Sequence, residues 1–249
     1  MHLYTKLVAP PLQPLISMNT QLFQRSAILF ALLSALLFFV FSSWAMAEYP
    51  GGTIHDRATE GYSFWYNYFS DLGRTRSWNG APNALSSRLF QAGLVTVGIS
   101  LGAYFLVLPT IFRQAEARFL ASVASLLGIL AAVCYVGIAL NPLNVNYRLH
   151  TLFVRAGFIA FLAMSLFYTL SILNEPGYPK HYARAFGLFS LILAMQVAIM
   201  LFGPRSWTSP GALLLQASAQ KVVVYAEMAC MVYQGVGAWR WISSWRDHP

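Results

Sequence analysis

Long apolar runs separated by short polar segments make up most of this chain of 249 residues. An α-helix rises about 1.5 Å per residue, so roughly 20 apolar residues span a hydrocarbon core about 30 Å thick. The pattern therefore predicts an all-α integral membrane protein with six transmembrane helices. We expect these helices over residues 26–47, 85–112, 119–140, 150–173, 184–203 and 213–242, with an N-terminal tail over 1–25 and a C-terminal tail over 243–249.

The first apolar run has an alternative interpretation as a secretory signal. Arg25 precedes the run, and Ala45-Met46-Ala47 at its end matches the small-residue pattern of a cleavage site. The run is long for the apolar part of a signal, which favours a transmembrane helix. Met18 offers a second start for the chain.

The longest polar interruption lies between the first two predicted helices. Within it, Tyr62, Trp65, Tyr66 and Phe69 recur at i, i+3, i+4 and i+7, the spacing of one helical face. Trp and Tyr favour the headgroup level of a bilayer, because their rings are apolar and their tips polar. We therefore expect a short interfacial helix here, as part of an aromatic belt or of a belt that also carries a ligand site.

Polar residues inside the apolar runs indicate where an internal site lies. Gln216, Gln220, Glu227 and Gln234 in the last helix step by four and seven residues and share one face. A charge in the hydrocarbon region costs about 2.5–3.5 kcal/mol, so Arg155 and Glu227 should face the bundle interior.

Six helices place both termini on one side of the membrane and the polar segment 48–83 on the other. That side also receives the beginnings of the fourth and sixth helices, so we expect a polar pocket that opens toward segment 48–83. Its candidate ligand-binding residues are Arg74, Arg76, Arg148, Arg155, Lys221 and Glu227. The structural alternative is that ion pairs such as Arg155 with Glu227, or Asp71 with Lys221, only fix helix packing.

His150 and Asp71 are the candidate catalytic residues of this pocket. An imidazole titrates near neutral pH, so His150 oriented by Asp71 is suited to act as a general base on water. The alternative for His150 is an interfacial hydrogen bond. His55 and Asp56 form a second candidate pair.

The net charge of +8 does not indicate nucleic-acid binding, because the basic residues are scattered at the ends of the apolar runs. Slightly more basic residues lie on the terminal side of the membrane than on the opposite side, which favours cytoplasmic termini. The sequence has no Asn-x-Ser/Thr acceptor, which favours a bacterial inner membrane. Cys134 and Cys230 lie inside apolar runs and suggest neither a disulfide framework nor a zinc site. We expect no metal and no cofactor.

Three short motifs resemble a known family. Tyr68-Phe-Ser-Asp-Leu-Gly73, His150 at the head of the fourth helix and Gln220-Lys-Val-Val-Val-Tyr225 resemble the six-helix DRAM-like superfamily. That superfamily includes uncharacterised bacterial relatives and eukaryotic proteins implicated in remodelling the lipid of GPI anchors. The resemblance implies the six-helix fold and adds Ser70 and Tyr225, with Asp71, His150 and Lys221, as site residues.

Three functions follow from these patterns. The first is a non-catalytic membrane protein that binds a lipid or an anionic headgroup, because arginine suits phosphate and carboxylate. The alternative is an intramembrane enzyme that hydrolyses or remodels a lipid or glycolipid, and the third is a small-solute transporter. The expected partners are a membrane lipid and a small-molecule ligand, and the sequence does not indicate protein partners.

Overall fold

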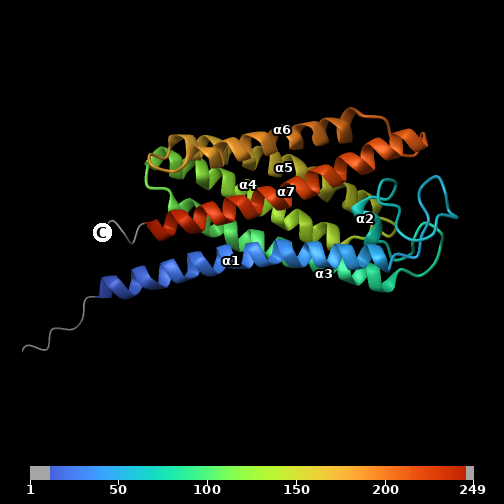
Figure 1. Ribbon diagram of the computed structural model, residues 1–249, viewed down its shortest axis with the longest axis horizontal. Coiled ribbons are helices and arrows are strands. Elements are labelled where there is room, and N and C mark those ends of the chain that lie inside the picture. Colours follow the sequence, from blue (N-terminus) through green and yellow to red (C-terminus); the bar gives the residue numbers. More distant parts are fainter. Residues whose placement is uncertain (1–11, 245–249) are drawn as a thin grey trace, which may run out of the picture.

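The computed structural model describes residues 12–244 and is helical throughout this part of the chain, apart from loops and two isolated β-bridges in the segment that follows the first helix. Six long helices cross the molecule from end to end, and one four-residue helix and one 3₁₀ helix complete it (Figure 1). The elements are α1 (Leu12–Ala47), α2 (Phe69–Leu72), α3 (Ala84–Val107), η1 (Leu108–Ile111), α4 (Ala115–Leu140), α5 (Tyr147–Asn174), α6 (Lys180–Phe202) and α7 (Pro210–Ser244).

The long helices form a closed ring. Each packs against its neighbours in the order α1, α3, α4, α5, α6 and α7, and α7 packs back against α1. The beginning of α1 and the end of α7 lie at one end of the molecule, which we name the terminal end (Figure 1). Loop 1 (residues 48–83, including α2) lies at the opposite end, which we name the loop end.

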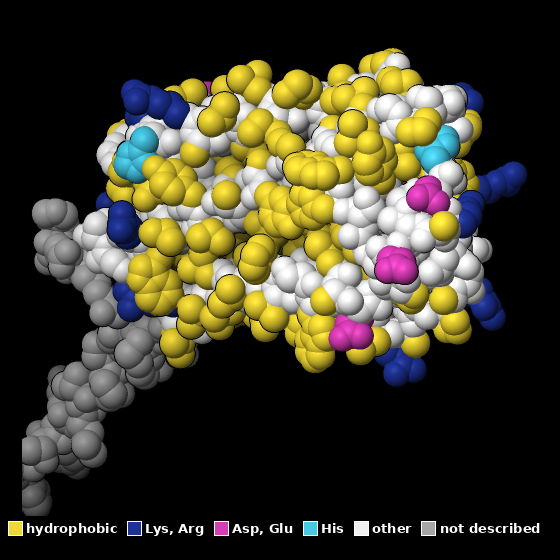
Figure 2. Space-filling model, turned by 45° about the vertical axis from the view of Figure 1, so that its right-hand side comes forward, with side chains coloured by type: hydrophobic (Ala, Val, Ile, Leu, Met, Phe, Trp, Pro, Cys, Tyr) yellow, Lys and Arg dark blue, Asp and Glu magenta, His cyan; other side chains and the backbone are white. Residues whose placement is uncertain are grey.

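The surface between the two ends is apolar. Figure 2 shows hydrophobic side chains across the middle of one face and most of the charged side chains toward the two ends. Within residues 12–244, five segments are long and apolar enough to cross a membrane: Thr20–Ala47, Ala84–Ile111, Ala115–Leu140, Tyr147–Asn174 and Lys180–Phe202. The prediction of an all-α integral membrane protein is therefore confirmed, with these five helices as candidate spans.

The N-terminal tail predicted over residues 1–25 is wrong for its second half, because α1 already begins at Leu12. Pro14 lies in the first turn of this helix, where the missing N–H has no helical acceptor to lose. Residues 1–11 of that predicted tail lie outside the described residues. At the other end, α7 continues to Ser244, and residues 245–249 of the predicted C-terminal tail are outside the described part as well.

The interfacial helix predicted from Tyr62 is also wrong. Residues 64–66 form a turn, Tyr68 is extended, and helix forms only over Phe69–Leu72, whose residues are all buried. The side chain of Asn67 accepts a hydrogen bond from the backbone N–H of Ser63, a local bond that competes with a continuous helix. The aromatic residues are therefore spaced as on one face of a helix but lie in turns, and they do not form one face.

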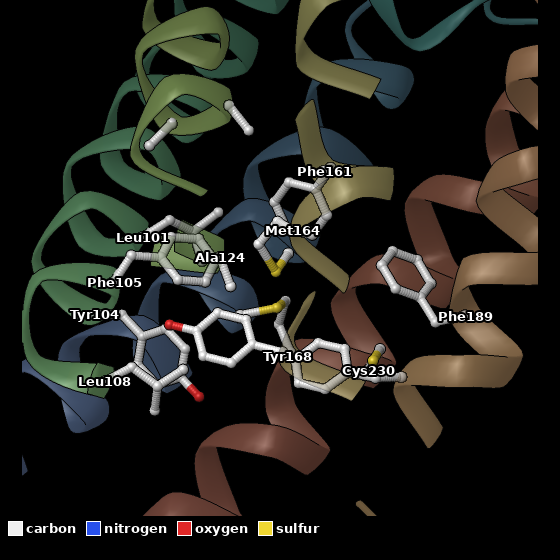
Figure 3. Packing of buried hydrophobic residues seen from close by; sticks show 14 of the residues in the cluster. Leu101, Tyr104, Phe105, Leu108, Ala124, Phe161, Met164, Tyr168, Phe189 and Cys230 are labelled. Carbon is white, nitrogen blue, oxygen red and sulfur yellow. The ribbon is translucent and has the colours of Figure 1, made fainter. Parts of the chain in front are cut away.

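The core of the terminal half is a stack of aromatic rings. The ring of Tyr168 stacks on those of Phe105, Phe112 and Phe186, with centroids 5.7–6.4 Å apart. Figure 3 shows how residues of α3, α4, α5, α6 and α7 converge around Tyr168. A Cβ atom at Gly128 would lie 2.5 Å from the ring of Phe105, so only glycine allows α4 to approach α3 this closely.

Candidate functional site

Loop 1 is organised by two fully buried polar side chains. Asn67 donates from Nδ2 to the carbonyl oxygen of Gly52 at 2.9 Å and to Oδ2 of Asp71 at 3.2 Å. Asp71 also accepts hydrogen bonds from the backbone N–H of Tyr68 at 2.9 Å and from Nε1 of Trp78 at 2.8 Å. Because these bonds link three parts of the loop, a 36-residue polar segment folds into one defined unit.

Burial governs the electrostatics of this unit. It raises the pKa of the Asp71 carboxyl, an effect that hydrogen bonds from Asn67, Tyr68 and Trp78 and the nearby Arg74 oppose. Burial likewise lowers the pKa of the Arg74 guanidinium, which lies 3.7 Å from the centre of the Trp78 ring. Asp71 therefore holds loop 1 together.

Helix α7 holds loop 1 onto the bundle. Gln220 accepts a hydrogen bond through Oε1 from the backbone N–H of Phe69 at 2.9 Å, at the beginning of α2. At the next residue, the Lys221 ammonium donates to the carbonyl oxygen of Asn67. It lies 5.2–5.8 Å from the centres of the Tyr62, Phe64 and Phe69 rings. Lys221 is 1% exposed, so its ammonium is buried in this contact.

A large cavity, here the outer cavity, lies between loop 1, α5, α6 and α7 at the loop end. Its volume is about 930 Å³. Burial raises the pKa of Tyr68, one of its lining residues, to about 12, so its hydroxyl stays protonated. The other polar side chains in the lining include Ser70, Arg74, His150, Arg155, Gln196, Arg205, Gln216 and Gln220.

The lining of the outer cavity is positively charged, and the Asp71 carboxyl near Arg74 lies behind it. Arg74, Arg155 and Arg205 line it, whereas no Asp or Glu is among its lining residues in the described part of the chain. Arg155 lies within the candidate span Tyr147–Asn174, and its guanidinium has no hydrogen-bond or carboxylate partner among the described residues. The cavity is therefore suited to an anion.

Gln196 of α6 adds an unsatisfied amide to the same cavity. The residue is 5% exposed, and its Oε1 atom has no hydrogen-bond partner among the described residues. A buried amide without a partner costs free energy, so a native example calls for a ligand or water. Its neighbour in the lining, Gln216, is satisfied by the carbonyl oxygens of Ile199 and Pro204.

His150 is held by the backbone. Its Nδ1 atom lies 2.8 Å from the carbonyl oxygen of Asn141, which places the proton on Nδ1 and leaves Nε2 as an acceptor. The pairing of His150 with Asp71 expected from the sequence is absent among the described residues, because the Asp71 carboxylate is occupied within loop 1.

A second, inner cavity of about 90 Å³ lies deeper in the ring of helices. Its lining is mostly apolar. Tyr135 donates a hydrogen bond to Glu227, the hydroxyls of Ser34 and Ser100 bond to each other beside it, and Ser70 and Gln220 line it where it meets the outer cavity. The expected pair of Arg155 with Glu227 is therefore not formed, since Glu227 faces α4 and Arg155 faces the outer cavity.

The structure brings together only part of the predicted site. Ser70, Arg74, His150 and Arg155 line the outer cavity, and Ser70 and Glu227 line the inner one. Asp71 and Lys221 lie buried behind the cavity wall, and Tyr225 packs against Phe64 and Phe69. Arg76 and Arg148 are exposed and line neither cavity.

Two residues of the outer cavity were missed in the sequence. Gln196 is the one amide inside the otherwise apolar run of α6, so the sequence could have indicated that it faces the interior of the bundle. Arg205 lies in the short segment between α6 and α7. A loop arginine alone does not indicate where its side chain points, so the sequence did not predict its place in the cavity.

Among the described residues, no group of three or more His, Cys, Asp or Glu side chains is arranged to hold a metal ion. Cys134 and Cys230 are both free and buried. The arrangement supports binding of an anion through arginine and amide groups, beside a histidine whose free ring nitrogen is an acceptor.

The chain was compared with curated proteins, with solved structures and with protein families. No curated protein and no solved structure matches it. One family model matches residues 49–237, which include loop 1 from Tyr49 onward, every lining residue of the outer cavity and the helical ring except α1 and the end of α7. The chain therefore belongs to the family described as a protein of unknown function (DUF998).

Proposed function

We propose that this membrane protein binds an anionic amphiphile, a membrane lipid or a related molecule, with its charged group in the outer cavity. The observation that carries the proposal is the lining of that cavity, which contains three arginines and no Asp or Glu among the described residues. A cavity of about 930 Å³ is large enough for a lipid headgroup, since ligand sites commonly measure about 300–1,000 Å³.

Arg155 supplies the strongest physical argument. A guanidinium within a membrane span is costly unless an anion or water compensates its charge. No carboxylate among the described residues does so, although Glu227 lies in the same bundle, bonded to Tyr135. A phosphate or carboxylate in the cavity would accept paired N–H donors from this planar group.

The same proposal accounts for the Gln196 amide. Its buried oxygen lacks a partner in the protein, and amide oxygen and nitrogen are interchangeable by a flip of the side chain. Either atom can therefore bond to a ligand hydroxyl or oxygen. Gln196 and Arg155 belong to neighbouring helices of the ring, α6 and α5, so one ligand in the cavity can contact both.

We further propose that α7 is a sixth membrane span. It is 35 residues long, about 50 Å at the rise of an α-helix, which exceeds the hydrocarbon thickness. Its polar residues lower its hydropathy but are buried, whereas Val222 on its other face is 57% exposed. In this arrangement both termini lie in the cytoplasm of a bacterium and loop 1 lies outside the inner membrane. The likeness to the DRAM-like superfamily stays a prediction.

Native mass spectrometry of the protein purified in mild detergent tests the proposal. We expect the wild-type protein to retain an anionic lipid and Arg155→Gln to lose about 90% of that retention, as a lost charge-assisted contact of 1.4 kcal/mol or more predicts. Arg148→Gln is the matched control, because Arg148 lies on the same helix outside both cavities. Equal retention by wild type and Arg155→Gln, or no retention by either, overturns the proposal.

A second candidate function is hydrolysis of a lipid ester, favoured by the free Nε2 acceptor of His150 and by Ser70 in the same cavity lining. A positioned general base contributes about 10²–10⁴-fold to rate. If the protein is a hydrolase, purified wild type releases fatty acid from lysophospholipid and His150→Gln lowers the rate by at least about a hundredfold. His181→Gln, at the terminal end, is the control, and an inert wild type excludes this function.

A further inference from the structure

We infer that the ligand has a single hydrocarbon chain and that this chain occupies the inner cavity while the anionic group stays in the outer one. The inference rests on the proposed function and specifies its ligand class. It follows from how the two cavities are placed, from the chemistry of their linings and from the difference in their volumes.

The two cavities lie against each other. Ser70, Val154, Phe158 and Gln220 line both of them, so these four side chains form the wall between the polar space and the apolar space. A molecule whose charged end contacts Arg155 has its other end directed at this wall. We infer that the chain passes this wall by rotation of the Phe158 side chain, which is 7% exposed.

The linings differ in whether their polar groups are satisfied. The outer cavity contains the unpartnered amide oxygen of Gln196. In the inner cavity, the polar groups of Ser34 and Glu227 are bonded to Ser100 and Tyr135, and no buried atom without a partner is among its described lining residues. Apolar cavities without unsatisfied groups stay dry and take up hydrocarbon. The outer cavity therefore suits a headgroup and the inner cavity a chain.

The volumes limit the ligand to one chain. The inner cavity has about 90 Å³, roughly a tenth of the outer cavity. An engineered apolar cavity of about 150 Å³ in another protein accommodates one benzene molecule. The inner cavity can thus receive one segment of hydrocarbon, and a second chain would have to displace the polar contacts of the outer cavity.

Probes that share one headgroup and differ in chain number test the inference. These are glycerol 3-phosphate, lysophosphatidate and phosphatidate, with no, one and two chains, and oleate is added as a one-chain carboxylate. By native mass spectrometry titration in non-ionic detergent, we expect a one-chain probe to bind about tenfold or more tightly than the zero-chain and two-chain probes, the effect of burying a few methylene groups.

Two valines of α7 provide a matched pair of variants. Val224 lines the inner cavity, whereas Val222 is exposed on the lipid-facing side of the same helix. We expect Val224→Phe to weaken binding of the one-chain probe about tenfold by filling the cavity, and Val222→Phe to leave it within about twofold. Val97→Phe, which fills the inner cavity from α3, repeats the test if Val224→Phe fails to fold.

The outcomes separate the inference from the proposed function. Equal binding of lysophosphatidate and phosphatidate, weakened by Arg155→Gln but unchanged in Val224→Phe, overturns the single-chain inference and leaves the proposed function standing. Glycerol 3-phosphate binding as tightly as the one-chain probes, in an Arg155-dependent way, also overturns the inference, because the ligand is then a soluble phosphate. Absence of any Arg155-dependent binding overturns both.

Discussion

The two halves of the helical ring are built from similar apolar sequence and yet differ in how they fill space. In the terminal half, the rings of Phe105, Phe112 and Phe186 stack around Tyr168, whose hydroxyl bonds to Ser125. In the loop half, the helices enclose two cavities, and Gln196 has a buried oxygen without a partner. The terminal half has a hollow of about 810 Å³ as well, but it is an apolar groove between α1, α6 and α7, outside the packed rings. The loop half therefore differs in that its hollow combines arginine side chains with an unpartnered buried amide oxygen.

The boundary between the halves runs through α5. Phe161 is fully buried against Phe105, Tyr135 and Phe189, whereas Phe158, about one turn nearer the loop end, lines both cavities. Interior packing near the density of organic crystals is normal for proteins, so retained space marks a site. Polar space beside this boundary, and not space alone, is what favours a site in the loop half.

Substitutions of these two phenylalanines should have the largest effects. We expect Phe161→Ala to lower the free energy of unfolding by about 3–5 kcal/mol, because it opens a void among packed rings. Phe158→Ala should cost about 1–2 kcal/mol less, since part of its surface already faces empty space. Equilibrium unfolding in detergent measures both values. Equal costs would show that the loop half is packed as tightly as the terminal half.

A second comparison concerns the effect on stability of replacing each of two buried glutamines. Gln234 donates to the carbonyl oxygen of Tyr182 at 2.8 Å, so Gln234→Leu removes a buried hydrogen bond and should cost about 0.5–1.5 kcal/mol. Gln196 has no partner to lose, so Gln196→Leu should change stability by less than about 0.5 kcal/mol.

Ligand retention should respond in the opposite order. Gln196→Leu removes a bonding group from the outer cavity and should lower retention of the anionic lipid severalfold, whereas Gln234→Leu lies away from both cavities and should not. Thermal unfolding and native mass spectrometry on the same two samples give both readouts. A large loss of stability in Gln196→Leu would mean that its amide is satisfied within the protein.

The last expected effect is local and concerns the attachment of loop 1. Lys221→Met keeps the length of the side chain but removes the hydrogen bond to the Asn67 carbonyl and the contacts of the ammonium with three rings. We expect local opening of loop 1 to become about tenfold more frequent, equivalent to about 1.4 kcal/mol.

Hydrogen exchange of amides 63–78 measures this opening. Val222→Met is the control, because Val222 directly follows Lys221 in the sequence and its side chain is exposed. Unchanged exchange in Lys221→Met would show that Gln220 and the Asn67–Asp71 network alone hold the loop. Faster exchange spread over all helices would indicate general destabilisation instead of a local role.

The sequence predicted the helical membrane fold well because hydrophobic runs of membrane length have few alternative structures. It also predicted that the polar stripe of α7 faces inward, and Gln216, Gln220, Glu227 and Gln234 are indeed buried. The early start of α1 escaped prediction, since its first residues lack the continuous apolar character of a span.

The site was less predictable, because the side of the membrane on which a residue lies does not determine which residues it contacts. Sorting residues by face grouped Asp71, His150, Arg148 and Lys221, although backbone groups and loop contacts separate them: Asp71 bonds within loop 1, His150 to Asn141 and Lys221 to Asn67. Hydrogen bonds to backbone carbonyls have no signature in side-chain patterns, so pairs of charged residues were predicted where the protein uses its main chain.

An experimental density map of the protein in lipid nanodiscs tests the central claim most directly, because it shows what fills the loop half. The account predicts elongated density in the outer cavity, with one end in contact with Arg155 and Gln196 and the other extending past Phe158 into the inner cavity. Side chains collapsed into both spaces, or separate peaks for water only, would contradict it.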